Sequence, residues 1–366
     1  MESHSSPPSP IDVAGLDLAE LEDALADLGV ERFHARQVYR WVHQRGVDDF
    51  AAMTDLSKAL RAELSRACTV RTPRVIERHR SADGTEKLLL ELGDHRRIES
   101  VFIPETPSNT LCVSTQVGCA MRCGFCLTGK MGLVRNLSAG EMVGQVRVLA
   151  GSLGLLRERF NIVLMGMGEP LHNYDATMKA LRMLGDPNGL AVSPRRITLS
   201  TVGLVPGLDR LATEPFMPNL AVSLHATTQQ ARDRLVPVGR KYTLEEVIEA
   251  CRRFPVKRRN RITFEYVLLA GVNDSPDDAR RLVRLLAGIR AKVNLIPLNE
   301  AAGIDYRRPD DERVDDFARI LADRHLTVSV RKSRGRDIRA ACGQLIVEGG
   351  VKSPAQNLAS LLARKS

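Results

Sequence analysis

Aromatic residues are scarce in this sequence. Phe, Trp and Tyr make up 4% of the 366 residues, so a broad aromatic platform that stacks nucleobases is not expected. Long apolar runs are also missing, since no stretch approaches the roughly 18 apolar residues of a membrane helix. The first residues, MESHSSPPSP, are polar and rich in proline. They predict a disordered tail over 1–10 and no signal peptide, so we expect no contact with a membrane.

A second pair of closely spaced metal ligands is missing as well. The sequence contains Cys119, Cys123 and Cys126 in a CxxxCxxC pattern, but no second CxxC pair and no HxxxH pair. Structural zinc sites are normally closed by four ligands, usually arranged as two pairs. Three thiolates instead suit a four-iron cluster whose remaining iron is open to an exogenous ligand. We therefore predict a 4Fe-4S cluster on these cysteines, and a reducing, cytoplasmic location that keeps them unoxidised.

Acidic residues are outnumbered by basic ones. The chain has 53 Lys and Arg against 44 Asp and Glu, a formal net charge of +9. Such an excess favours a polyanionic partner, because neutralising phosphates releases counterions. A zinc-containing RNA-binding protein without catalysis is therefore the alternative function of a different class.

The cysteine pattern, with Phe125 directly before the last cysteine, resembles that of the radical S-adenosylmethionine (SAM) enzymes. The resemblance implies that the amino and carboxylate groups of SAM chelate the open iron. It also implies that an electron from the cluster breaks a carbon–sulfur bond of SAM and releases a 5′-deoxyadenosyl radical. The protein would hold the sulfonium over the cluster and exclude water.

The first hundred residues divide into a helical part and a β part. Apolar periodicity predicts three short helices over Leu16–Leu28, Phe33–Arg45 and Lys58–Cys68. These helices predict a small helical accessory domain over 11–68. The period then changes to two, which predicts strands over Val75–Arg80, Glu86–Leu92 and Arg97–Ile103, with Asp83-Gly84 as a hairpin turn. Residues 69–110 are therefore expected to form a β linker or extension.

Strands and helices alternate from Leu111 onward. The predicted strands are Leu111–Gln116, Asn161–Met165, Arg196–Thr201, Asn219–Ser223, Ile262–Leu268 and Lys292–Ile296. Helices are predicted between and after them, near Ala139–Ala150, Tyr174–Leu184, Gly207–Ala212, Leu244–Arg253, Pro276–Ala287 and Asp310–Ala322. Six βα units predict a parallel sheet that falls short of a closed eight-stranded barrel. The expected fold class is α/β, an open partial (β/α)6 barrel of the radical SAM type over 111–330, followed by a C-terminal segment over 331–366.

Polar residues gather where these strands end. By the rule that holds for full barrels, loops at the carboxyl ends of the strands carry the chemistry. Met165–Pro170 reads MGMGEP, in which glycines permit close backbone approach and the carboxylate could accept hydrogen bonds from an amino group. Each of these residues has an ordinary structural explanation by itself, but together they predict a polar rim that binds a nucleoside. The candidate cofactor-binding residues are Gly168, Glu169, Ser200, Ser223, Leu224, His225 and Asn299.

Two cysteines outside the cluster motif are further candidates. Cys112 lies seven residues before Cys119 on the first predicted barrel strand, and Cys342 lies in RGRDIRAACGQL. Arg334, Arg336 and Arg339 precede Cys342, and nearby cations favour the thiolate. The alternative is that Cys112 packs in a strand and Cys342 is a loop thiol. Composition and spacing leave both interpretations open.

Six segments in the same order resemble the motifs of the RlmN family, the dual-specificity 23S rRNA and tRNA adenine carbon-2 methyltransferases. They are TLCVSTQVGCAMRCGFCLTG, MGMGEPLHNY, RRITLSTVG, LAVSLHA, NLIPLN and RGRDIRAACGQL. The resemblance covers nearly the whole chain and implies that the helical domain binds RNA. The sister Cfr family, which methylates carbon 8 of the same rRNA adenosine, is similar throughout and is the alternative of the same class.

The resemblance implies a function and a mechanism. The substrates would be adenosine 2503 of 23S rRNA and adenosine 37 of tRNA. SAM would be used twice per turnover, first to methylate Cys342 and then, at the cluster, to make the adenosyl radical that activates the S-methyl group. The methylene radical would add to carbon 2, and Cys112 would attack the Cys342 sulfur, release the product and leave a disulfide.

The same resemblance implies partners and a base. An external electron donor would reduce the cluster, and a thiol reductant would reopen the disulfide. The base that removes the carbon-2 proton is Glu99 by the family pattern, with Cys112 as the alternative. A monomer is expected. Two basic stretches are candidates for phosphate contact, Arg240-Lys241 and the run of Arg252, Arg253, Lys257, Arg258, Arg259 and Arg261, although an ordinary solvated charge run is the alternative for the latter.

Overall fold

The computed structural model describes residues 10–104, 108–257 and 260–347. Most of the predicted N-terminal tail, Arg258, Arg259 and the end of the predicted C-terminal segment lie outside the described residues. The chain divides into two compact units. Among the described residues, none of the helices has the length and apolar character needed to cross a membrane.

The first unit contains the N-terminal helices. They are α1 (Leu18–Ala26), α2 (Arg32–Tyr39) and α3 (Lys58–Ala67), with a π-helical turn over Arg40–Gln44 after α2. The start of α1 is fixed by a capping box between Asp17 and Glu20. Two short strands, β1 (Ile11–Asp12) and β2 (Cys68–Thr69), pair in parallel. Apolar side chains from all three helices form one core that also buries Cys68.

Two helices from the middle of the sequence belong to the same unit. It includes Ser138–Glu158 and Asp175–Ser193, and therefore α5 (Ala139–Ser152) and nearly all of α6 (Tyr174–Gly185). Gly140 shows how closely α5 packs within this unit, because a Cβ atom there would lie 2.6 Å from the Cα of Gly15. The α/β part of the sequence thus supplies two helices to the N-terminal unit.

The second unit is organised around a ten-stranded sheet of order β14-β13-β12-β11-β10-β9-β6-β5-β4-β3. All neighbours from β6 to β14 run parallel. β4 and β5 are antiparallel to each other, as are β5 and β6. The strands are β3 (Arg74–Arg80), β4 (Glu86–Glu91), β5 (Arg97–Ile103), β6 (Thr110–Cys112), β9 (Asn161–Leu164), β10 (Ile197–Thr201), β11 (Asn219–Ser223), β12 (Ile262–Leu268), β13 (Ala291–Pro297) and β14 (Thr327–Val330).

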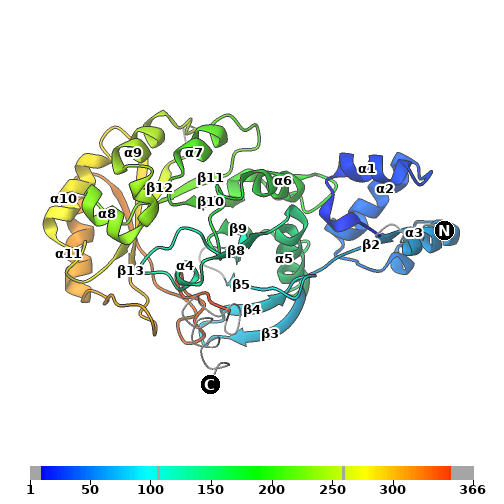
Figure 1. Cartoon of the computed structure of the whole chain (residues 1–366), viewed down its shortest axis with the longest axis horizontal. Helices are drawn as coiled ribbons and strands as arrows, with labels where there is room; N and C mark the ends of the chain where they lie inside the picture. The colour runs from blue at the N-terminus through cyan, green and yellow to red at the C-terminus, as the bar shows by residue number, and fades with distance from the viewer. Residues whose placement is uncertain (1–9, 105–107, 258–259, 348–366) are drawn as a thin grey trace, which may run out of the picture. The chain divides into compact units, whose positions relative to one another are not determined.

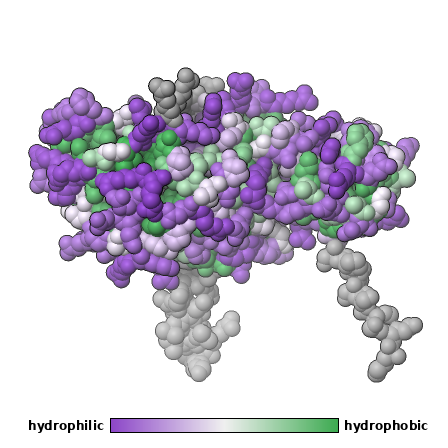
Figure 2. Space-filling model, turned by 90° about the horizontal axis from the view of Figure 1, so that it is seen from above, coloured by the Kyte–Doolittle hydropathy of each residue, from purple (hydrophilic) through white to green (hydrophobic). Residues whose placement is uncertain are grey.

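Helices follow most of the parallel strands. Figure 1 shows α7–α11 on one side of β10–β13. Their apolar faces are buried, and α9 and α10 each begin at a capping box. In the view of Figure 2 most of the surface is hydrophilic, with smaller hydrophobic areas between. These helices are α7 (Val205–Leu211), α8 (Gln229–Leu235), α9 (Leu244–Arg253), α10 (Pro276–Leu285) and α11 (Asp311–Ala322).

The predicted open, partial barrel is confirmed, but two details of the strand prediction are wrong. The first barrel strand ends at Cys112, because Thr115 and Gln116 donate backbone hydrogen bonds to Met167 O and take the chain out of the ladder. Gln116 then begins β7 (Gln116–Gly118), which pairs with β8 (Leu133–Asn136) in a separate sheet. A seventh parallel strand, β14, was not predicted. The strand β5 pairs with β6 and so extends the barrel sheet.

Candidate active site

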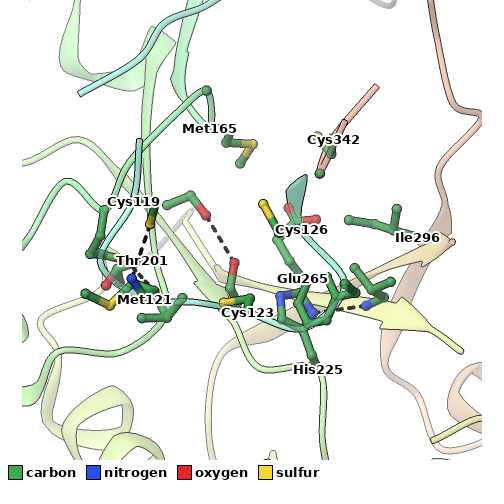
Figure 3. Close-up of a pocket in the computed structure, with 18 of the residues that line it drawn as sticks. Cys119, Met121, Cys123, Cys126, Met165, Thr201, His225, Glu265, Ile296 and Cys342 are labelled. Carbon is green, nitrogen blue, oxygen red and sulfur yellow. Dashed lines mark hydrogen bonds between the residues drawn. The ribbon is translucent and has the colours of Figure 1, made fainter. Parts of the chain in front are cut away.

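One pocket lies at the carboxyl ends of the parallel strands, where the fold class places the chemistry. Glu265 and Arg331 carry charged groups to its wall, and Met121, Thr201 and Val267 are among the other lining residues. Figure 3 shows residues from distant parts of the chain around this single space. Of the predicted site residues, the pocket is lined by Cys119, Cys123, Cys126, Gly168, Glu169, Ser200, Ser223, His225, Asn299 and Cys342.

The cluster loop runs from β7 to α4 (Leu127–Met131). Within it, Met121 N lies 3.5 Å from the Cys119 sulfur, and Cys126 N donates to Cys123 O at 3.2 Å. The loop is folded tightly, since a Cβ atom on Gly129 would lie 2.9 Å from Cys123 N. Burial raises the pKa of the Cys119 thiol to about 12. Metal binding to these thiols must therefore displace protons.

The side chains of Cys119, Cys123 and Cys126 all line this pocket (Figure 3). Across the described residues, no three His, Cys, Asp or Glu side chains are grouped as ligands of a single metal ion. A four-iron cluster sets a different geometric requirement, because each thiolate binds its own iron.

The glycines after β9 pack against the chain that leads to the cluster loop. A Cβ atom on Gly166 would lie 2.7 Å from Ser114 Oγ and from Val113 O. Gly168 has a φ of +108°, and its Cβ atom would lie 2.7 Å from Thr115 Oγ1. The close backbone approach predicted for these glycines is therefore an approach to other parts of the protein itself.

Gly168→Ala should lower stability, because it adds both left-handed strain and a steric clash. Left-handed strain costs roughly 1–2 kcal/mol, and overpacking adds about 1–3 kcal/mol. The matched control is Gly29→Ala, which has a φ of +75° but no heavy atom within 4 Å of the added Cβ. In thermal unfolding followed by circular dichroism, Gly168→Ala should lower the midpoint at least twice as much as Gly29→Ala. Equal midpoints for the two variants would show that the segment around Thr115 can move aside.

Glu169 lines the pocket, is buried and has both carboxylate oxygens engaged in hydrogen bonds. Oε1 accepts a hydrogen bond from Leu171 N at 3.0 Å, and Oε2 accepts one from Val202 N at 2.9 Å. Burial raises the pKa of this carboxyl to about 7, although these hydrogen bonds act in the opposite direction. Because each oxygen retains a second lone pair, the side chain can still accept a donor from a bound cationic group.

His225 is fixed by two contacts. Its Nδ1 accepts a hydrogen bond from Val267 N at 3.0 Å, so the neutral ring carries its proton on Nε2. The Phe125 ring meets it edge to face at 4.7 Å, which gives the aromatic before the last cluster cysteine a packing role. Burial, and then the charge of Arg232, lower the pKa of His225 to about 3. The ring is therefore a neutral donor at physiological pH.

The remaining strand-end residues show the same combination of polarity and burial. Ser200 and Ser223 place their hydroxyl oxygens 3.5 Å apart on neighbouring strands. Asn299 donates from Nδ2 to Cys342 O at 3.3 Å. Its Oδ1 is buried and has no hydrogen-bond partner in the described part of the chain, which leaves an unmet acceptor at the pocket. Leu224 does not line the pocket, and its carbonyl is taken by Arg232 Nη1 at 2.7 Å.

The C-terminal segment returns to the cluster loop. Leu127 N donates to Gly343 O at 2.8 Å, and Thr128 Oγ1 donates to Leu345 O at 2.7 Å. A Cβ atom on Gly343 would lie 3.3 Å from Phe125 O. These contacts hold Cys342 at the pocket that the three cluster cysteines also line.

Comparisons with known proteins agree with this geometry. The model of the ribosomal RNA large subunit methyltransferase N-terminal domain matches residues 11–70, and that of the radical SAM superfamily matches residues 113–285. The dual-specificity RNA methyltransferase RlmN of Geobacter sulfurreducens is 52% identical over 337 residues, which cover 92% of each chain. RlmN of Syntrophotalea carbinolica is 52% identical over 349 residues, which cover 94% of this chain and 92% of the relative. This chain belongs to the RlmN family.

A solved structure supports the same assignment. The crystal structure of a radical SAM methyltransferase from Sphaerobacter thermophilus matches with a TM-score of 0.88 and 48% identity, covering 92% of this chain and 99% of that one. The chain is thus a radical SAM RNA methyltransferase of the RlmN family, which implies a 4Fe-4S cluster and SAM. The pocket fits these groups, because it offers three thiols, a buried carboxylate and the unmet acceptor of Asn299.

Two of the residues that the RlmN pattern singles out, Cys112 and Glu99, are not among the residues that line the pocket. Cys112 is buried at the end of β6, and its pKa is raised to about 12 by burial and then by the charge of Cys342. Glu99, on β5, is an ion-pair partner, with Oε1 2.8 Å from Lys87 Nζ and Oε2 accepting from Ile346 N at 2.8 Å. Burial raises the pKa of Glu99. Its carboxylate therefore ties the segment after Cys342 to the sheet.

The predicted cations near Cys342 need correction. Arg334 donates to Asp83 O at 3.3 Å, and Arg336 and Arg339 are exposed. The arginine that lines the pocket together with Cys342 is Arg331. Glu265 was missed as well, although a charged residue inside the apolar strand ITFEYVL was a visible signal. For Arg331 no local signal existed, because its position depends on the unpredicted strand β14.

Proposed function

We propose that this protein methylates carbon 2 of adenosine 2503 in 23S rRNA and of adenosine 37 in tRNA through an S-methylcysteine on Cys342. The single observation that carries the proposal is that Cys342, from the far end of the chain, lines the same pocket as Cys119, Cys123 and Cys126. A methyl carrier has to stand where the radical is made, and Gly343 and Leu345 are hydrogen-bonded to the segment directly after Cys126.

The residues around the pocket have different roles in this proposal. Cys119, Cys123 and Cys126 would hold the cluster, and the polar groups of Glu169, Ser200, Ser223, His225 and Asn299 would hold SAM. Together these cofactors supply a 5′-deoxyadenosyl radical, and SAM is also the source of the methyl group. The thiol of Cys342 carries that group, and Cys112 resolves the covalent RNA adduct by forming a disulfide with Cys342. Reopening it requires an external thiol reductant, and an external electron donor completes the cycle.

The target base has to leave its stack to reach a pocket inside a partial barrel. An unpaired or flipped adenosine is therefore the expected substrate form. Carbon 2 is tested with purified protein, RNA transcripts and nucleoside mass spectrometry against standards for each methylated position. Methylation only at carbon 8 would contradict the proposal. We place the enzyme in the cytoplasm as a monomer, because reduced thiols and its large RNA partner favour both.

Arg240 and Lys241 are the better of the two candidate phosphate contacts. Both are exposed, and they follow α8, whose last residue Leu235 accepts a hydrogen bond from Gly124 N of the cluster loop at 3.0 Å. Of the other run, Lys257 and Arg261 line a smaller pocket at the amino ends of β11 and β12, the opposite edge of the sheet from the active-site pocket. Within that run, Arg252 pairs with Glu249, and Arg253 pairs with Asp209 at 2.8 Å.

Salt titration of RNA affinity should separate the two stretches. The double variant Arg240→Ala/Lys241→Ala should reduce the slope of log affinity against log salt by about 0.7–0.9 for each lost phosphate contact. Arg252→Ala/Arg253→Ala loses the same charge and should leave the slope unchanged, which makes it the matched control. If only Arg252→Ala/Arg253→Ala reduced the slope, the RNA would instead bind at the other edge of the sheet.

A further inference from the structure

A row of polar side chains crosses the barrel below the methyl-carrier thiol. In the strand register, Ser223 of β11 is level with Glu265 of β12, Glu265 with Asn294 of β13, and Asn294 with Ser329 of β14. Side chains that are level on neighbouring strands share one face of a sheet. Ser223 and Glu265 line the pocket, so this row lies on the pocket side.

Hydrogen bonds connect three members of the row. Ser329 Oγ donates to Asn294 Oδ1 at 3.0 Å, and Asn294 Nδ2 donates to Glu265 Oε2 at 2.7 Å. The amide of Asn294 is thereby held in one orientation, which in turn holds the carboxylate. Glu265 is only 5% exposed. A carboxylate buried to this degree is costly unless it faces a cation, and burial does raise its pKa while Arg331 lowers it.

Arg331 supplies that cation. It lies two residues after Ser329 and so on the same face, and its backbone N donates to Leu295 O at 2.8 Å, which continues the register of β14. Its side chain lines the pocket together with Glu265 and Cys342, and Figure 3 shows the last two on one side of that space. Negative charge on Cys342, and then on Glu265, raises the pKa of Arg331.

This arrangement would stabilise negative charge on the Cys342 sulfur, which the surroundings of the sulfur otherwise disfavour. The Cys342 sulfur has to be nucleophilic to receive a methyl group, but a partly buried thiolate is penalised by desolvation. It also faces the cluster cysteines and the carboxylate of Glu265, all of which repel negative charge. The guanidinium of Arg331, which lines the same pocket, offsets both effects. A fixed guanidinium also loses less conformational entropy on forming a contact with the sulfur than a free side chain does.

We propose that Arg331 is the positioning residue of the methyl-carrier thiol, oriented by the Glu265–Asn294–Ser329 row. Its guanidinium holds the Cys342 sulfur in the pocket and balances the negative charge that makes the sulfur reactive. The assignment rests on the proposed role of Cys342 as the methyl carrier.

The test measures the reactivity of Cys342 itself rather than RNA methylation. The full chain is produced under iron limitation and reconstituted anaerobically without SAM, so that Cys342 carries no methyl group. It is then treated with chloroacetamide, a neutral alkylating reagent, and the Cys342 peptide is quantified over time by mass spectrometry. Iron and sulfide content are measured for every variant to show that cluster loading is equal.

Arg331→Met should slow Cys342 alkylation by about tenfold, the effect of removing one adjacent cation from a thiol. Arg331→Lys keeps the charge and should stay within about threefold of the wild-type rate. Arg336→Ala removes an exposed arginine of the same segment and should leave the rate unchanged. The proposal is overturned if Arg331→Met reacts at the wild-type rate, or if Arg331→Lys is as slow as Arg331→Met. Failure of the wild type to methylate RNA would instead contradict the proposed function, and the alkylation rates would not depend on it.

Discussion

Cys342→Ala should abolish RNA methylation while the protein still loads its cluster and cleaves SAM. The side chain that is removed lines the pocket, but it is not one of the three thiols of the CxxxCxxC loop. The contacts that hold its segment, from Leu127 N to Gly343 O and from Thr128 to Leu345 O, are made by backbone carbonyls that the substitution keeps. The radical machinery should therefore remain intact and only the methyl carrier be lost.

The expected result has two parts that are measured on the same sample. Deoxyadenosine is quantified by chromatography, and methyladenosine in RNA by nucleoside mass spectrometry. Cys251→Ala is the matched control, because Cys251 is buried in α9 and should retain methylation. Any methyladenosine from Cys342→Ala above the no-enzyme background would mean that the methyl group does not pass through this thiol.

Cys112→Ala should stop the reaction one step later, with RNA covalently attached to the protein. Cys112 ends β6, and the charge of Cys342 adds to burial in raising its pKa. If Cys112 resolves the adduct by attacking the Cys342 sulfur, its loss leaves no nucleophile for that step. Multiple turnover should then fall by about a hundredfold or more, while the covalent complex accumulates.

Denaturing gels with labelled RNA detect this complex directly. Wild-type protein should show little of it, and Cys342→Ala none, because that variant has no carrier to attach. A Cys112→Ala variant that released methylated RNA at the wild-type rate would assign the resolving role to another group. The buried thiol of Cys112 has a raised pKa of about 12, so its attack on sulfur needs local activation. The charge of Arg331, which lowers the pKa of Cys112, acts in that direction.

The structure shows contacts of Glu99 that indicate a structural role. The family pattern implies a proton acceptor, whereas here both carboxylate oxygens are engaged, by Lys87 and by Ile346 N. Ile346 lies four residues after Cys342, so the ion pair fixes the segment that carries the thiol. Removing one member of a buried ion pair commonly costs 3–5 kcal/mol. Loss of activity on replacing Glu99 would therefore not by itself identify it as the base.

Much of this protein was determined by its sequence alone. The CxxxCxxC spacing, the MGMGEP motif and the polar strand ends are local patterns, and each lies at the pocket where parallel strands end. Local spacing is encoded by consecutive residues, so it does not depend on how distant parts of the chain meet. The partial barrel followed from the alternation of strands and helices for the same reason.

Tertiary structure decided what depends on register and on long-range contact. It ended the first barrel strand at Cys112, added β14, and brought Arg331 rather than Arg334, Arg336 or Arg339 to Cys342. It also placed one basic run at the opposite edge of the sheet. Strand pairing joins residues that are far apart in sequence, so no local pattern specifies which side chains become neighbours. The sequence could therefore single out the candidate cysteines, but only the folded chain shows the charges that surround them.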